Sequence, residues 1–194
     1  MKDTINIFWF RRDLRLDDNA GLYHALKSNY PLLCLFIFDR AILDELEDKD
    51  DARVTFIYQT IKNLHDELEK HGSSLLVLHD NAVDAWKQIA KDYTINTVFA
   101  NHDYEPYAKL RDNEISKLLS EQSIGFKTYK DQVIFEKEEV TKDDGKPYTI
   151  FTPYSRKWKA ALTKFYLKSY PTKDRKSTRL NSSHSDRSRM PSSA

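Results

Sequence analysis

Short apolar runs recur in the first half of the chain, and polar or turn-forming residues separate them. Each run is four to seven residues long and is rich in β-branched and aromatic side chains. This composition is typical of strands that are buried on both faces of a sheet. We therefore predict buried strands over residues 5–10, 32–38, 75–78 and 97–100.

Between these runs, apolar positions recur at intervals of three and four residues, which is the spacing of one face of an α-helix. One such stripe consists of Val54, Ile57, Tyr58, Ile61, Leu64 and Leu68. A second consists of Ala82, Val83, Trp86, Ile89 and Ala90. We expect each stripe to pack one helix against the sheet.

Residues with strong backbone preferences indicate where the helices begin and end. The cap-type residues before the first expected helix are Asp17, Asp18 and Asn19, and Pro106 suits the first turn of a later one. Gly72 and Gly125 each follow a helical pattern and precede an apolar segment. At both glycines we predict the left-handed backbone that commonly ends a helix.

The alternation of strand and helix repeats four or five times, which predicts the α/β class with a parallel sheet of about five strands. Right-handed crossovers favour a doubly wound, Rossmann-like arrangement with helices on both faces of the sheet. In such a sheet, ligands bind beyond the carboxyl ends of the strands, at the point where the winding reverses.

The alternation fades after about residue 130. Gly and Pro in a charged cluster predict a turn at residues 143–147, and residues 152–158 begin a basic helix or linker. From residue 176 onward there are seven serines and no aromatic residue, a composition that cannot form a core. This last stretch also looks like translated sequencing-adapter sequence.

Composition places the chain among soluble globular proteins, with 40% apolar and 31% charged residues. The formal net charge is only +1, although residues 156–176 carry eight cations and one acid. No stretch approaches the length of a membrane span. The one cysteine, Cys34, is expected to be a buried hydrophobic residue and fits a reducing cytoplasm. We therefore expect a cytoplasmic protein.

Several common site types lack their motifs. The four glycines include no Gly-x-Gly pair, which argues against a glycine-rich dinucleotide loop. There is no Gly-x-Ser-x-Gly nucleophile motif. The six histidines and one cysteine show no metal-ligand spacing, so no metal site is predicted.

The segment that follows the first predicted strand is unusual, because residues 9–19 contain three arginines and three aspartates. One interpretation is a salt-bridged loop that caps the next helix. The other is that Arg11, Arg12 or both face a ligand at the sheet edge, where a guanidinium suits an anionic or flat partner.

This segment is also similar to the opening signature of the photolyase/cryptochrome family. Further segments resemble the family in the same order, and the resemblance extends from residue 4 to about residue 170. The segments are residues 8–19, 36–39, 53–54, 101–107 with 111–112, and 145–154 followed by Trp158.

The resemblance implies a light-driven flavoprotein. In this family reduced FAD, bound in a helical C-terminal domain, donates an electron to a flipped-out pyrimidine dimer in UV-damaged DNA. The N-terminal α/β domain holds an antenna chromophore, which is a folate, a deazaflavin or a flavin. We expect an antenna domain over residues 4–131, a linker over 132–175 toward a missing FAD-binding helical domain, and a disordered, non-native tail over 176–194.

We expect the chain to be a monomer and to be catalytically inactive alone, so no catalytic residue is assigned. Two alternatives stay open: a fragment of a cryptochrome photoreceptor and a free-standing nucleotide-binding module. The antenna site implied by the resemblance consists of Arg11, Phe36, Ile37, Phe38, Asp39, Arg53, Val54, Asp103 and Glu105. Glu105 has a second interpretation, as a carboxylate favoured at a helix start. The loop around it resembles members that use a deazaflavin or flavin.

Overall fold

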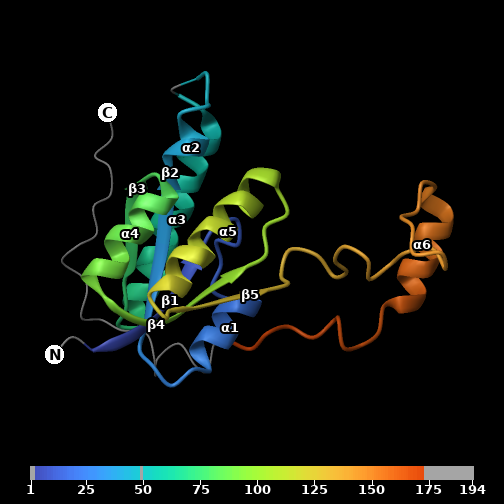
Figure 1. The fold of residues 1–194 in the computed structure, drawn as a ribbon. Helices are drawn as coiled ribbons and strands as arrows, with labels where there is room; N and C mark the ends of the chain where they lie inside the picture. Colours follow the sequence, from blue (N-terminus) through green and yellow to red (C-terminus); the bar gives the residue numbers. More distant parts are fainter. Residues whose placement is uncertain (1–2, 49, 173–194) are drawn as a thin grey trace.

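The computed structural model describes residues 3–48 and 50–172, and its centre is a twisted parallel sheet (Figure 1). The sheet has five strands in the order β3-β2-β1-β4-β5, and every neighbouring pair is parallel. The strands are β1 (Thr4–Phe10), β2 (Leu32–Asp39), β3 (Leu75–Asp80), β4 (Thr94–Asn101) and β5 (Gly125–Tyr129). The predicted fold class and the four predicted strands are confirmed.

Helices cover both faces of the sheet, as a doubly wound fold requires. The helices are α1 (Ala20–Leu26), α2 (Arg40–Leu43), α3 (Ala52–Lys70), α4 (Ala82–Asp92), α5 (Pro106–Glu121) and α6 (Phe151–Ala161). Buried residues of α1 and α3 share one core with the sheet, whereas those of α4 and α5 share the other. The short α2 was not predicted.

The central strand β1 supplies both cores, because successive side chains of a strand point to opposite faces. Ile7 and Trp9 face α4 and α5, and Trp9 meets Trp86 edge-to-face with ring centroids 5.5 Å apart. Phe8 and Phe10 face α1 and α3. Full burial of each such side chain stabilises the fold by about 1.5–3 kcal/mol.

Helix α1 approaches the sheet unusually closely at Gly21. Of the three predicted cap-type residues, Asn19 caps the helix by accepting a hydrogen bond from the Leu22 amide at 3.0 Å. A Cβ atom on Gly21 would lie 2.7 Å from Asn101 Oδ1 and 2.8 Å from a ring carbon of Phe8. The close contact of α1 with β1 and β4 therefore requires glycine at this position.

The predictions for helix ends held in part. Gly72 has φ +71°, as expected, and Pro106 is the first residue of α5. The prediction for Gly125 was wrong, because the left-handed residue after α5 is Ser123, with φ 60°. Gly125 begins β5 instead, where a Cβ atom would lie only 3.0 Å from Thr97 Oγ1.

Helix α3 contacts the core only from Ile57 onward. Ile61, Leu64 and Leu68 are its buried residues, whereas Tyr58 is exposed and Val54 is half-buried. The expectation that the whole stripe packs on the sheet was therefore wrong for the first turns. Figure 1 shows α2 and the adjoining end of α3 beyond the strands, where the sheet offers no surface to cover.

After β5 the chain leaves the sheet, forms α6 at a distance and returns to α1 (Figure 1). We call residues 3–48 and 50–131 the body, residues 132–168 the arm, and residues 169–172 the return segment. The predicted basic helix is confirmed as α6, and none of its residues is buried. The predicted tail over 176–194 lies outside the described residues.

Candidate functional site

The winding of the sheet reverses at β1, which pairs with β2 on one side and β4 on the other. The carboxyl ends of β1 and β4 therefore define the crevice where doubly wound folds bind ligands. The residues that follow these strands are 11–13 and 102–104. These are the segments in which the sequence places most of its charged site candidates.

A buried polar cluster closes the base of this crevice. Asn101 Nδ2 donates to Asp13 Oδ2, and Asn19 Nδ2 donates to the same carboxylate oxygen at 3.1 Å. Asn101 Oδ1 accepts from the Gly21 amide at 2.7 Å. Arg15 pairs with Asp131 at 2.8 Å. The salt-bridged, helix-capping interpretation of this loop is thus confirmed for Arg15, which pairs with Asp131, and for Asn19, which caps α1.

Two guanidinium groups flank the indole of Trp9. The Cζ atoms of Arg11 and Arg111 lie 5.1 and 4.8 Å from the Trp9 ring centroid. Both arginines pair with Asp112 of α5, Arg11 through Oδ2 and Arg111 through Oδ1 at 3.1 Å. Contacts of this kind fix the two cations in a partly desolvated environment.

Arg11 retains an unused donor. Its side chain is only 6% exposed, and its Nη2 atom is buried with no hydrogen-bond partner. Within the part of the chain that the structure describes, the one other such side-chain atom is Trp86 Nε1. A buried donor without a partner costs about 1–3 kcal/mol, so each such atom in a native fold requires an explanation.

Asp39 is a junction of four donors rather than a free carboxylate. Its Oδ2 atom accepts from the Tyr107 hydroxyl at 2.7 Å and lies 3.8 Å from Arg111. Its Oδ1 atom accepts from the Ala41 and Ala82 amides at 3.2 and 3.4 Å. Burial and the hydrogen bond to Asp39 raise the pKa of Tyr107 above its ordinary range.

The apolar candidates share one strand end but not one face. Phe36 and Phe38 pack edge-to-face at 4.9 Å in the core under α1 and α3, whereas Ile37 lies in the core under α4. All three are buried. The structure therefore brings them together along β2, with Phe36 and Phe38 on one face of the sheet and Ile37 on the other.

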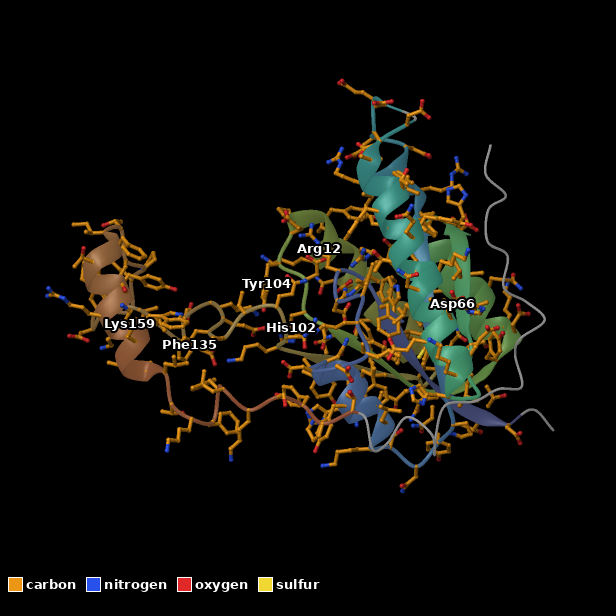
Figure 2. The ribbon with its side chains drawn as sticks, turned by 180° about the vertical axis from the view of Figure 1, so that it is seen from behind. Arg12, Asp66, His102, Tyr104, Phe135 and Lys159 are labelled. Atoms are coloured by element: carbon orange, nitrogen blue, oxygen red, sulfur yellow. The ribbon has the colours of Figure 1, made fainter. Side chains whose placement is uncertain are left out.

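Asp103 and Glu105 lie in the loop after β4, opposite Arg12. The guanidinium of Arg12 lies 3.5 Å from a carboxylate oxygen of Asp103 and 3.7 Å from one of Glu105. The side chain of Asp103 is 8% exposed, whereas that of Glu105 is 58% exposed. Glu105 occupies the capping position of α5 but makes no capping hydrogen bond. Figure 2 shows Arg12 next to Tyr104 on this edge.

Arg53 and Val54 lie at the start of α3. Arg53 is exposed and binds Asp51 through Nε at 2.9 Å, which lowers the pKa of that carboxyl to about 2. Nearby in the chain, Ile42, Phe56 and Tyr58 are exposed, and Phe56 reaches 68%. Phe56 is not among the predicted site residues, and it lies outside the apolar stripe of α3 in the sequence.

A second concave region lies between α5 and β5. It has a volume of about 470 Å³ and shares only Asp103 with the predicted site residues. Its wall includes Lys109, Asn113 and Ser116 of α5, and its other lining residues include Phe126 and Thr128 of β5.

The loop that leaves the body is tied to the end of β4. His102 Nδ1 and the Tyr104 hydroxyl both contact Glu136 Oε1. Burial acts to raise the pKa of Glu136, but the hydrogen bonds from Tyr104 and His102 outweigh it and lower that pKa. Burial, together with the contact to Glu136, raises the pKa of Tyr104. These contacts place the start of the arm beside the crevice.

Across residues 3–48 and 50–172, no helix is both long enough and apolar enough to cross a membrane. A family model described as DNA photolyase matches residues 6–174. A deoxyribodipyrimidine photo-lyase of Synechococcus sp. is 32% identical over 154 residues, which are 79% of this chain and 32% of that protein. Cryptochrome-1 of Arabidopsis thaliana is 27% identical over 83% of this chain and 23% of its own length.

Among solved structures, an archaeal photolyase from Sulfolobus tokodaii with two FAD molecules matches with a TM-score of 0.69. That protein is 32% identical, and the match covers 78% of this chain and 33% of the other. The chain thus spans about a third of the length of the photolyases that it matches.

Proposed function

This chain belongs to the DNA photolyase family, and we propose that it is the antenna part of a deoxyribodipyrimidine photolyase. In this proposal residues 4–131 hold a light-harvesting pigment, and residues 132–175 lead to a helical domain that binds FAD. The intact protein then repairs pyrimidine dimers in UV-damaged DNA, and this chain alone is inactive. The family match over residues 6–174 supports this division.

The observation that carries the proposal is the unused Nη2 donor of Arg11. It is buried at the carboxyl end of β1, the strand at which the winding of the sheet reverses. A polar edge of a bound ligand would accept this hydrogen bond and remove the cost of leaving the donor without a partner. Pairing with Asp112 holds the guanidinium in a fixed orientation before a ligand arrives.

The other predicted residues fit a flat heterocycle with polar edges. Phe36 and Phe38 supply apolar surface on one face of the sheet, and Ile37 supplies it on the other. Val54 adds apolar surface at the start of α3, Asp103 and Glu105 supply carboxylates, and Arg53 supplies an exposed cation. Asp39 serves as a positioning residue, because its oxygens already hold Tyr107 and two backbone amides. The bound pigment would absorb light and pass excitation energy to the FAD.

A flavin or deazaflavin is our preferred pigment class over a folate. The loop of residues 103–107 resembles the members that use these pigments. The relative from Sulfolobus tokodaii contains two FAD molecules, with a novel light-harvesting cofactor implied for it. We further propose a monomeric, cytoplasmic protein, which fits the single, buried Cys34.

Titration of the purified chain with FMN, FAD and methenyltetrahydrofolate tests this proposal, with flavin or folate fluorescence as the signal. We expect a flavin to bind with quenched fluorescence. Arg11→Lys keeps the cation for Asp112 but removes the second guanidinium donor, so flavin affinity should fall about tenfold. Arg15→Lys is the matched control and should bind flavin as the unaltered chain does, because Arg15 pairs with Asp131. Failure of all three pigments to bind, or equal binding by Arg11→Lys, would refute the site.

A cryptochrome photoreceptor is the second candidate, and the similarity to Cryptochrome-1 of Arabidopsis thaliana supports it. Expression of the complete coding region separates the two functions. Dimer repair on illumination with blue light is the expected result. Flavin absorption that bleaches in light without repair would favour the photoreceptor.

A further inference from the structure

The concave region between α5 and β5 is separate from the pigment crevice, and we call it the α5–β5 pocket. Its volume of about 470 Å³ lies within the range of about 300–1,000 Å³ that is typical of small-molecule sites. Its lining residues come from the loop after β4, from α5, from β5 and from the start of the arm. Figure 2 shows His102 and Tyr104 on this side of the body, toward the arm.

The two carboxylates that line the pocket are already compensated by arginines. Asp112 pairs with both Arg11 and Arg111. The guanidinium of Arg12 lies 3.5 Å from a carboxylate oxygen of Asp103. The negative charge of these two side chains is therefore balanced, and they do not make the pocket acidic.

Two lysines line the same pocket and have no anionic partner. Lys109 comes from the first turn of α5, and Lys137 comes from the arm. Across residues 3–48 and 50–172, no carboxylate lies within ion-pair distance of either ammonium group. An ammonium is a compact point charge that binds phosphate well. Two such groups at one cavity therefore favour a phosphorylated ligand.

The backbone of the arm holds Lys137 at the wall of the pocket. Its φ of 43° is a left-handed conformation that residues other than glycine rarely adopt. Such a conformation costs about 1–3 kcal/mol and is concentrated at functional sites such as ligand clamps. The neighbouring Glu136 is fixed by His102 and Tyr104, and its carbonyl accepts from the Glu139 amide at 2.8 Å. The position of Lys137 is thus set before any ligand binds.

The neutral lining suits a flat ring that carries polar groups. Phe126 is half-buried and supplies aromatic surface. Asn113, Ser116 and Thr128 supply one amide and two hydroxyls. Within the part of the chain that the structure describes, none of these three side chains has a hydrogen-bond partner in the protein. Their donors and acceptors are therefore free to bind a ligand.

We propose that the α5–β5 pocket binds a small phosphorylated ligand with one aromatic base, of the size of a nucleoside monophosphate. Lys109 and Lys137 bind the phosphate, the amide and hydroxyls bind polar edges, and Phe126 packs against the base. This inference goes beyond pigment binding. The pocket shares only Asp103 with the nine proposed pigment-site residues, and Asp103 is occupied by Arg12, so either proposal can fail alone.

Isothermal titration calorimetry of the full chain with adenosine monophosphate (AMP) tests this proposal. Adenosine and inorganic phosphate are titrated separately, because they carry the two halves of the ligand. We expect AMP to bind, and each half to bind at least about tenfold more weakly, because charge-assisted hydrogen bonds and ring packing both contribute. Inorganic phosphate that binds as tightly as AMP would overturn the assignment of a nucleotide.

A pair of double variants locates the binding. The test variant combines Lys109→Gln with Lys137→Gln. The control combines Lys117→Gln with Lys127→Gln, which makes the same change in net charge on α5 and β5 outside the pocket lining. The side chain of Lys127 points to the opposite face of β5 from Phe126, because side chains alternate along a strand.

AMP affinity should fall about tenfold or more in the test variant, because two contacts to the phosphate are lost. It should change less than about twofold in the control, because water and salt screen distant charges. Absence of AMP binding, or equal losses in the two variants, would overturn the proposal. AMP binding that Arg11→Lys weakens and FMN displaces would also overturn it, because the nucleotide would then occupy the pigment crevice.

Discussion

The body and the arm achieve order by different means. In the body, two apolar cores lie on opposite faces of one sheet, and many large side chains are fully buried. In the arm, α6 buries no residue, and one aromatic cluster around Phe135 holds it. Cooperative packing therefore maintains the body, whereas the position of the arm depends on a few specific contacts.

Those contacts attach the arm at both ends. At the outgoing end, Glu136 contacts His102 and Tyr104. At the returning end, Thr172 Oγ1 donates to the Leu16 carbonyl at 2.7 Å, and the Tyr170 amide donates to Asp18 at 2.8 Å. A segment fixed at two points can leave the core between them without losing its place. The predicted linker is therefore attached to the body at both of its ends.

Replacing one tryptophan in each region should give the largest difference in stability between the body and the arm. Trp86 is fully buried in the body, so Trp86→Ala should lower the free energy of unfolding by about 3–5 kcal/mol. Trp158→Ala removes an aromatic pair of the arm worth about 1 kcal/mol and should leave unfolding of the body unchanged. Urea denaturation followed by far-ultraviolet circular dichroism measures both. Equal losses in the free energy of unfolding would contradict the distinction between the cooperatively packed body and the arm.

A pair of glycine substitutions gives the next largest effect. Gly21→Ala places a Cβ atom 2.7 Å from Asn101 Oδ1, and such overpacking should destabilise the body by about 1–3 kcal/mol. Gly145→Ala meets no atom within 4 Å, although φ is +78°. Its strain of about 1–2 kcal/mol falls on a turn of the arm. The same urea experiment should therefore detect Gly21→Ala alone, and a normal midpoint for that variant would show that α1 can shift.

The smallest effect concerns the outgoing attachment and its dependence on pH. The pKa of Glu136 is lowered in the folded protein, so its stabilisation is present above the ordinary carboxyl pKa of about 4.3. That stabilisation is lost as the pH falls through the folded pKa. Glu136→Gln should weaken the attachment by about 1 kcal/mol at neutral pH.

Limited proteolysis of the arm measures this attachment. Cleavage should be faster in Glu136→Gln than in the unaltered chain at neutral pH. The neighbouring Glu138→Gln, at an exposed position, serves as the control and should be cleaved at the original rate. The difference between Glu136→Gln and the unaltered chain should disappear in strongly acidic buffer, provided that an acid-active protease is used. If the difference in cleavage rate persists in acidic buffer, the charge of Glu136 is not its cause.

Much of the body was predictable from the sequence because its determinants are local. Apolar runs become strands, the cap at Asn19 and the proline at 106 begin helices, and Cys34 is buried with its pKa raised to about 12. Gly125 was misassigned because a glycine can serve a turn or a close approach equally well. The contact with Thr97 that decides between them is made across two strands.

The position of the candidate residues in the fold was predictable from the sequence, but the partners of their side chains were not. The carboxyl edge of the sheet was the expected location, and seven of the nine predicted residues follow or end a strand there. Sequence could not indicate that Asp112, 101 positions away, would pair with Arg11. Nor could it indicate that the Tyr107 hydroxyl would donate a hydrogen bond to Asp39. Both partners come from the first turns of α5, which the fold brings to the carboxyl ends of β1 and β2.

The sequence by itself determined the class of fold, the order of its elements and the family to which the chain belongs. These follow from periodicity, turn chemistry and ordered motifs, all of which are read along the chain. Only the tertiary structure decided which charges are used and which are free. It left Nη2 of Arg11 without a partner and held the arm cations apart from the acids of the body. The reason is that pairing and burial depend on distances between elements, which the crossovers and packing of the whole fold set.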